Sequence, residues 1–185
     1  MHTELTQTDL AEPLRITTPG THVYQLSEAC NSTLDILVTV PDAHVFVYGA
    51  FHLRGTQRTT LTITQHHHAP GSASHVLIKS VLDDHAHFTC TGTIHIDSTS
   101  ATTHATFANH NLVVSTDAHV RTTPQLEVFP STVQCSHSAT VATLNSAHLH
   151  YLMTRGLSEV AARRTLIDGF LHEVTQKLQC HTAQR

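Results

Sequence analysis

The chain of 185 residues is poor in charge: charged side chains make up 13% of it, about half the usual share. It has two lysines (Lys79, Lys177), no run of basic residues and a formal net charge of -4. A nucleic-acid groove needs clustered cations that replace the counterions of the phosphates. The composition therefore argues against nucleic-acid binding.

Long apolar runs and targeting signals are also missing from the sequence. No segment approaches the run of about 18 apolar residues that a membrane-spanning helix needs, and the first residues have neither a basic start nor an apolar stretch. We therefore expect a cytoplasmic chain without a membrane span. The four cysteines lie far apart without a C-x-x-C pair, which argues against a zinc knuckle and predicts reduced thiols.

The sequence contains none of the common catalytic motifs. There is no serine nucleophile elbow, no glycine-rich phosphate loop and no H-E-x-x-H segment. Asp83 and Asp84 are adjacent, and adjacent side chains on a strand or turn diverge, so a solvated turn is the favoured interpretation. A β-solenoid enzyme acting on carbohydrate would need paired carboxylates, which the sequence lacks. We expect a protein that is not an enzyme.

What the sequence does contain, from residue 33 to residue 144, is a series of short β-branched runs separated by polar turns. Several runs alternate, as in Thr60-Leu61-Thr62-Ile63-Thr64, which predicts one buried and one solvated face. An antiparallel sandwich and a parallel β-solenoid both fit, and threonine-rich faces with few hairpin signals favour the solenoid. Residues 1–32 are interpreted as an irregular lead-in. Exposed solenoid edges need a cap or a partner.

The pattern becomes helical in residues 145–185. Asn145 or Ser146 is expected to cap a short helix through Thr154, which Gly156 ends, and Ser158 is expected to cap a longer helix. The longer helix carries one apolar stripe, formed by Leu166, Ile167, Phe170, Leu171, Val174 and Leu178. Packing of this stripe on the chain's own core is favoured, and docking of a partner stays open.

Cys135 and His137 are the residues best suited to carry chemistry. They share one face of a strand, so they either fill the core together or serve one metal ion or cluster, for which two ligands are too few. The sequence also has 19 histidines, including the triplet His66 to His68. An independent histidine-rich metal-binding or storage module is therefore the alternative hypothesis.

Several segments, taken in order, resemble the SufB/SufD family of iron–sulfur cluster assembly proteins. His67-His68-Ala69-Pro70 with Ser74, Lys79 to Ala86 (KSVLDDHA) and Asn109 to Ser115 (NHNLVVS) are similar to H-x-A-P, KGVLDD-x-A and NRNLLLS of the family. Pro124 to Val128 (PQLEV) with Val133 to Val141 (VQCSHSATV) resembles its P-x-LEI and DVKCSHGATVG signature, and Tyr151 to Leu157 (YLMTRGL) resembles YL-x-SRGI. Ser138 and Ala142 stand where this signature has glycine.

The SufD branch is the more similar one. SufB members have a cysteine in the coil that here reads Phe107 to His110, and H-E-A-T where this chain has His137 to Thr140. Relatives carry a substantial helical region before the β-helix, so this chain is expected to be SufD-like and shortened at its N-terminus.

The resemblance implies a mainly β fold: a right-handed parallel β-helix with a C-terminal helical pair. It further implies a non-catalytic scaffold subunit that pairs with a SufB-like subunit. Pairing with a second copy as a homodimer is left open by the sequence. The helices would dock a SufC-like ATPase through Tyr151, Leu152, Arg155 and Gly156. His137, with Cys135 as the less certain ligand, would contact a transient iron–sulfur cluster at the subunit interface, and no cofactor would be permanently bound.

Overall fold

The computed structural model describes residues 2–5, 12–26 and 31–183. Its elements, in chain order, are β1 (His2–Leu5), β2 (Leu14–Ile16), β3 (Gly20–Leu26), β4 (Ser32–Val38), β5 (Ala43–Leu53), β6 (Arg58–His67), β7 (Ala73–Leu82), β8 (His87–Ile96), β9 (His104–Val113), β10 (His119–Val128), β11 (Gln134–Thr143), α1 (Ser146–Thr154) and α2 (Glu159–Ala183).

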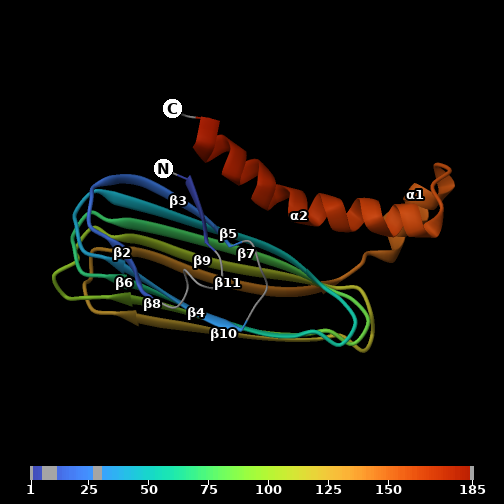
Figure 1. Cartoon of the computed structure of the whole chain (residues 1–185), viewed down its shortest axis with the longest axis horizontal. Helices are drawn as coiled ribbons and strands as arrows, with labels where there is room; N and C mark the ends of the chain where they lie inside the picture. The colour runs from blue at the N-terminus through green and yellow to red at the C-terminus, as the bar shows by residue number, and fades with distance from the viewer. Residues whose placement is uncertain (1, 6–11, 27–30, 184–185) are drawn as a thin grey trace.

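The strands form a parallel β-helix (Figure 1). Odd-numbered strands make a six-stranded sheet in the order β1-β3-β5-β7-β9-β11, and even-numbered strands make a five-stranded sheet in the order β10-β8-β6-β4-β2. Hydrogen bonds between neighbouring coils join residues 29 to 32 positions apart, which is the length of one coil. The predicted parallel solenoid with a C-terminal helical pair is confirmed, and the sandwich is excluded.

Residues 1–32, predicted to be an irregular lead-in, contain β1, β2, β3 and the start of β4 where the structure describes them; residues 1, 6–11 and 27–30 lie outside the described residues. Val23 and Leu26 of β3 are buried. The conformation of β3 is fixed by its pairing with β5, in which Gly20 lies beside Ala43, and such pairing outweighs weak local periodicity. The other proposed boundaries, 33–144 and 145–185, stay a prediction.

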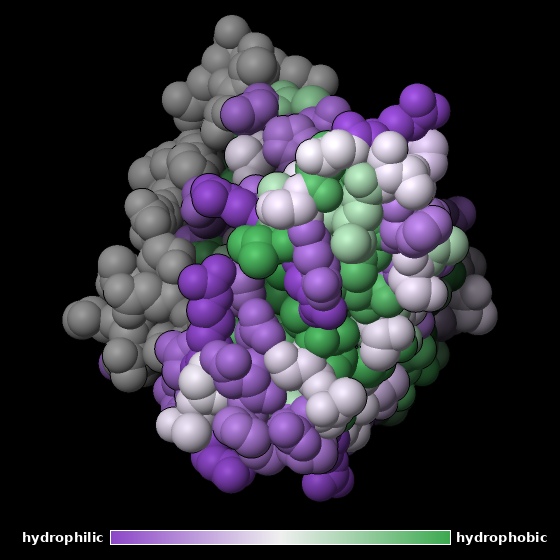
Figure 2. Space-filling view, turned by 90° about the vertical axis from the view of Figure 1, so that its right-hand side faces the viewer, coloured by the Kyte–Doolittle hydropathy of each residue, from purple (hydrophilic) through white to green (hydrophobic). Residues whose placement is uncertain are grey.

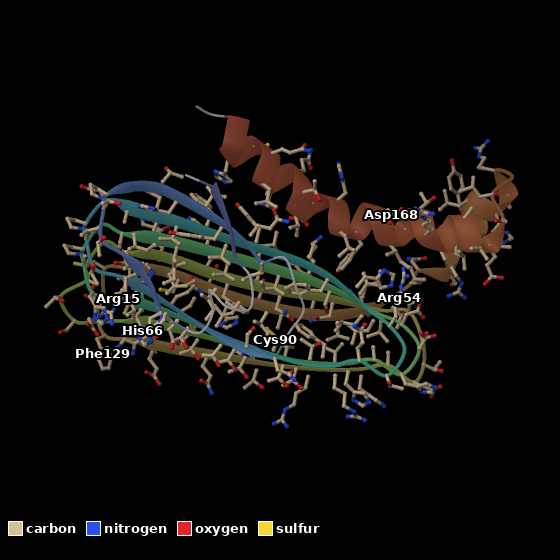
Figure 3. The ribbon with its side chains drawn as sticks, viewed as in Figure 1. Arg15, Arg54, His66, Cys90, Phe129 and Asp168 are labelled. Atoms are coloured by element: carbon tan, nitrogen blue, oxygen red, sulfur yellow. The ribbon has the colours of Figure 1, made fainter. Side chains whose placement is uncertain are left out.

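The core lies between the two sheets and follows the alternation of the strands. In β8, Phe88, Cys90 and Ile94 are buried, whereas the threonines between them face outwards. Figure 3 shows Cys90 between the sheets. Burial raises the pKa of this thiol to about 12, so Cys90 is a protonated core residue.

Helix α2 covers the outer face of the six-stranded sheet, and α1 lies beyond the ends of the strands (Figure 1). Ile167, Val174 and Leu178 of the predicted stripe are buried against this sheet, so the stripe packs on the chain's own core. The buried Lys79 of β7 anchors the helix, since its Nζ donates to the Phe170 carbonyl at 2.9 Å. Gly169 has open space at its Cβ position, so no close backbone approach requires a glycine there.

Among the described residues, no helix is long and apolar enough to cross a membrane.

Candidate functional site

Strand β11 places Cys135 and His137 on the inner face of the last coil, as their spacing predicts. Cys135 lies beside Ala105 and His137 beside Phe107 in the register with β9. Ala105 and Phe107 belong to the core, and Cys135 packs against that core. The thiol and the imidazole therefore point into the end of the β-helix.

The imidazole of His137 is half-buried, and its ring nitrogens are unpaired among the described residues. Both ring nitrogens are buried, and neither has a hydrogen-bond partner among the described residues. An unsatisfied buried polar group costs about 1–3 kcal/mol, so the unpaired imidazole is a candidate for binding a group from outside the chain. Burial lowers the pKa of His137, against a smaller opposing contribution from the nearby Gln125 backbone, whose geometry falls short of a hydrogen bond. The ring is thus held neutral, which is the form that binds metals.

Cys135 is a weaker ligand in this state. It is half-buried and free, and burial raises the pKa of its thiol, against a smaller opposing effect of the Ala105 backbone. A thiol ligates a metal as the thiolate, so Cys135 would have to lose its proton first. Ser138 and Ala142, which stand at glycine positions of the signature, do not have a positive φ, so neither is strained.

The last coil leaves its apolar inner face uncovered. Leu126 and Val128 of β10 are 50% and 39% exposed, although their register neighbours Ile94 and Ile96 are 0% exposed. We call the four exposed large hydrophobic residues of this coil the open rim: Leu126, Val128, Phe129 and Val141. β10 and β11 are also the outermost strands of their sheets at this end. An uncovered apolar rim beside free strand edges is typical of a protein interface.

The histidine triplet is divided between two faces. His67 points into the core, where its ring nitrogens lie 2.7 Å from the hydroxyls of Ser72 and Ser74. His66 and His68 lie on the outer face with parallel rings 6.1 Å apart. His68 pairs with Asp97, which also contacts His95. Within the described ranges no group of three histidine, cysteine or acidic side chains is arranged to hold a metal ion.

The helical corner presents the four residues predicted to dock a partner. Asn145 caps α1, because its side chain accepts hydrogen bonds from the backbone N–H groups of the first turn. Tyr151 is 56% exposed, and the guanidinium of Arg155 lies 5.2 Å from its ring centroid. Leu152 is half-buried, and Gly156 follows α1 with a φ of 96°.

The corner is otherwise exposed. No residue of α1 is buried, and Met153 and Val160 add exposed apolar surface. Figure 2, seen from the end at which α1 lies, shows hydrophobic surface among hydrophilic residues. The corner is therefore accessible from solvent.

A groove of about 610 Å³ between α2 and the turns of the β-helix was not predicted from any sequence pattern. Arg54, Asp83 and Arg163 contribute to its lining, and Figure 3 shows Arg54 and Asp168 facing each other across it. These residues lie far apart in the chain, so only the folded structure brings them together. The lining of the groove contains both arginine and aspartate side chains, so the groove does not favour a ligand of one charge.

Comparison with known proteins identifies the family of this fold. Residues 21–170 match the family profile described as "SUF system FeS cluster assembly, SufBD core domain". This range includes the β-helix from β3 onwards, α1 and the first half of α2.

Three relatives illustrate the match. An iron–sulfur cluster assembly SufBD family protein of Synechocystis sp. is 33% identical over 131 residues, which are 71% of this chain and 28% of the relative. The iron–sulfur cluster assembly protein SufD of Escherichia coli is 32% identical over 106 residues (57% of this chain, 25% of the relative). SufD of Plasmodium falciparum is 27% identical over 128 residues (69% and 9%). The matched part is thus about a quarter of the two bacterial relatives.

Proposed function

The chain belongs to the SufBD core family of SUF-system iron–sulfur cluster assembly proteins, and from this membership we propose that it is a non-catalytic scaffold subunit. In this role it pairs with a SufB-like subunit through the open rim and docks a SufC-like ATPase through the α1 corner. The observation that carries the proposal is the unpaired imidazole of His137 beside an uncovered apolar rim.

The rim supports pairing with another β-helix. The uncovered positions Leu126 and Val128 continue the inner columns that Ile94 and Ile96 fill one coil earlier. A second coil end placed on the rim would bury these side chains and pair the edges of β10 and β11, which is how parallel strands are stabilised. A SufB-like chain is the proposed partner, and a second copy of this chain is the competing outcome.

The paired rim would enclose the cluster as cargo rather than as a resident cofactor. His137 supplies one neutral imidazole, and Cys135 one thiol after deprotonation. An iron–sulfur cluster needs more ligands than these two, so the partner has to supply the remainder. This requirement explains why a subunit with few ligands of its own is useful only within a complex.

The α1 corner supports docking of the ATPase. Tyr151, Met153 and Val160 are exposed apolar groups on the helical pair, and exposed apolar groups of this kind bind partners through burial. Nucleotide-driven movement of the partner would then act through α2 on the sheet that carries β11. The chain itself would carry out no bond-breaking step.

Anaerobic co-expression of the full chain with SufB-like and SufC-like partners tests the proposal. We expect a complex that accumulates iron and sulfide, and His137→Ala is expected to reduce both strongly while the complex still forms. The double variant His66→Gln/His68→Gln is the matched control and should leave cluster content unchanged. Loss of metal from the double variant, with His137→Ala intact, would instead support an independent histidine-rich module.

Two surface variants separate the interfaces. Val141→Glu places a charge on the rim at a residue that is 54% exposed, so it should abolish pairing without unfolding the chain. Thr56→Glu, in an exposed turn, controls for the added charge. Tyr151→Ala should release only the ATPase, and Gln176→Ala on the exposed side of α2 should release neither partner. Retention of both partners by Val141→Glu and Tyr151→Ala would contradict the proposed interfaces.

A further inference from the structure

The imidazole of His137 rests on the ring of Phe107, its register neighbour on β9. The two ring centroids are 4.7 Å apart with an angle of 52° between the ring planes. Phe107 is fully buried, and its ring offers neither a hydrogen-bond donor nor a conventional acceptor. Contact with this ring therefore supports the imidazole and leaves both of its nitrogens available.

The ring of Phe107 in turn depends on Gly92, which lies on β8 in the opposite sheet. A Cβ atom built at Gly92 would lie 2.5 Å from both Cε1 and Cζ of Phe107, closer than real Cβ contacts. The glycine thus leaves the space that the ring fills. Because the two residues belong to opposite sheets, the ring spans the core in the coil that precedes the rim.

The coil before this one fills the same two positions differently. Ile63 is the register neighbour of Gly92, and Val76 is that of Phe107. Two branched aliphatic side chains are therefore exchanged for a glycine and a phenylalanine. The exchange occurs in the coil next to His137, where it replaces an aliphatic contact from each sheet with one flat ring from β9.

We infer that Gly92 and Phe107 form a floor that fixes the imidazole of His137 at the open rim, which makes Phe107 a positioning residue for the proposed cluster site. The inference rests on the proposed function for its purpose but not for its geometry. The floor keeps the imidazole from turning into the core. Phe107→Leu or Gly92→Ala would change this support.

The titration of the His137 ring, followed by NMR on the isolated full chain, tests the floor. The signal is assigned by its absence in His137→Gln. In the unchanged chain it should titrate below the ordinary value of 6.5. Phe107→Leu and Gly92→Ala should each move its midpoint towards that value, because the ring gains room and water. Phe88→Leu, at another fully buried phenylalanine, is the matched control and should leave the midpoint in place.

A double variant checks the contact between Gly92 and Phe107. Gly92→Ala alone should lower the melting temperature, and Gly92→Ala/Phe107→Leu should recover part of that loss because the ring is gone. In the double variant, the titration midpoint of His137 should stay closer to the ordinary value than it is in the unchanged chain. An unchanged midpoint in folded Phe107→Leu, or a double variant whose two losses simply add, would overturn the inference. If Gly92→Ala does not fold, Phe107→Leu decides alone.

These measurements need no cluster and no partner, so the inference can be refuted without refuting the proposed function, and the reverse. Normal cluster assembly by His137→Ala would refute the proposed function and leave the NMR result standing. If Phe107→Leu moves the His137 midpoint towards the ordinary value but assembles clusters normally, the floor is confirmed. Cluster assembly would then tolerate a less firmly held imidazole.

Discussion

His67 is expected to make the folded chain sensitive to mild acid. Its side chain is 0% exposed, and its ring nitrogens lie 2.7 Å from the hydroxyls of Ser72 and Ser74. Burial lowers its pKa from 6.5 to about 4. The unfolded chain therefore binds a proton near pH 6.5, whereas the folded chain binds it only near pH 4. Stability is fully present above pH 6.5 and is lost as the pH falls through this window.

The pKa difference sets the size of the effect. Each unit corresponds to 1.36 kcal/mol, so the shift to about 4 is equivalent to a loss of about 3 kcal/mol between neutral pH and pH 4. Domains of this size have a free energy of unfolding of about 5–15 kcal/mol, so the loss is a large part of the total stability. His67→Gln removes the titrating ring but keeps a hydrogen-bonding group, and it should cost about 1 kcal/mol at pH 7.

Urea unfolding of the unchanged chain and of His67→Gln, from pH 7 to pH 4.5, measures the difference. The variant should be the less stable protein at pH 7 and the more stable one at pH 4.5, so the two curves should cross. All other histidines are common to both proteins and cancel. Ile96→Val, at the register neighbour of His67, is the control and should cost about 1 kcal/mol at every pH. A difference between His67→Gln and the unchanged chain that does not vary with pH would refute the reasoning.

Three further predictions concern the helical segment. Lys79→Met should lose the hydrogen bond to the Phe170 carbonyl and the ion pair with Glu173, at a cost of about 2 kcal/mol, and hydrogen exchange should become faster in α2 but not in β5. Asn145→Ala should cost about 1 kcal/mol through loss of the α1 cap, whereas Asn145→Asp should keep most of it, as circular dichroism and melting can show. Gly156→Ala should cost about 1 kcal/mol because its φ of 96° strains a side chain, although open space surrounds the position; an unchanged melting temperature would contradict this.

The parts of the fold that could be predicted are those in which the local pattern and the tertiary structure agree. Alternation in Thr60 to Thr64 appears as the buried and outward faces of β6, and the stripe of α2 appears as its contact with the six-stranded sheet. Strands β2 and β3 were missed because their conformation comes from pairing with later coils. Local sequence carries little of that information.

The candidate site was predictable only in part. The spacing of Cys135 and His137 fixes their common face, and the structure places both on it. The sequence could not show that both imidazole nitrogens lack a partner, nor that Gly92 makes room for Phe107 beneath them. Both facts depend on contacts across two sheets. The groove near Arg54 and Asp168 escaped prediction for the same reason.

The open rim has a consequence for the supply of this subunit in a cell. The end of the β-helix that exposes unpaired strand edges together with Leu126 and Val141 tends to associate with other chains until a partner covers it. Copies made in excess of the partner would associate end to end or aggregate. Copies made in matching amounts would be bound by the partner as they are synthesised. The stoichiometry of production, rather than the affinity of the finished complex, would then govern how much of the subunit survives.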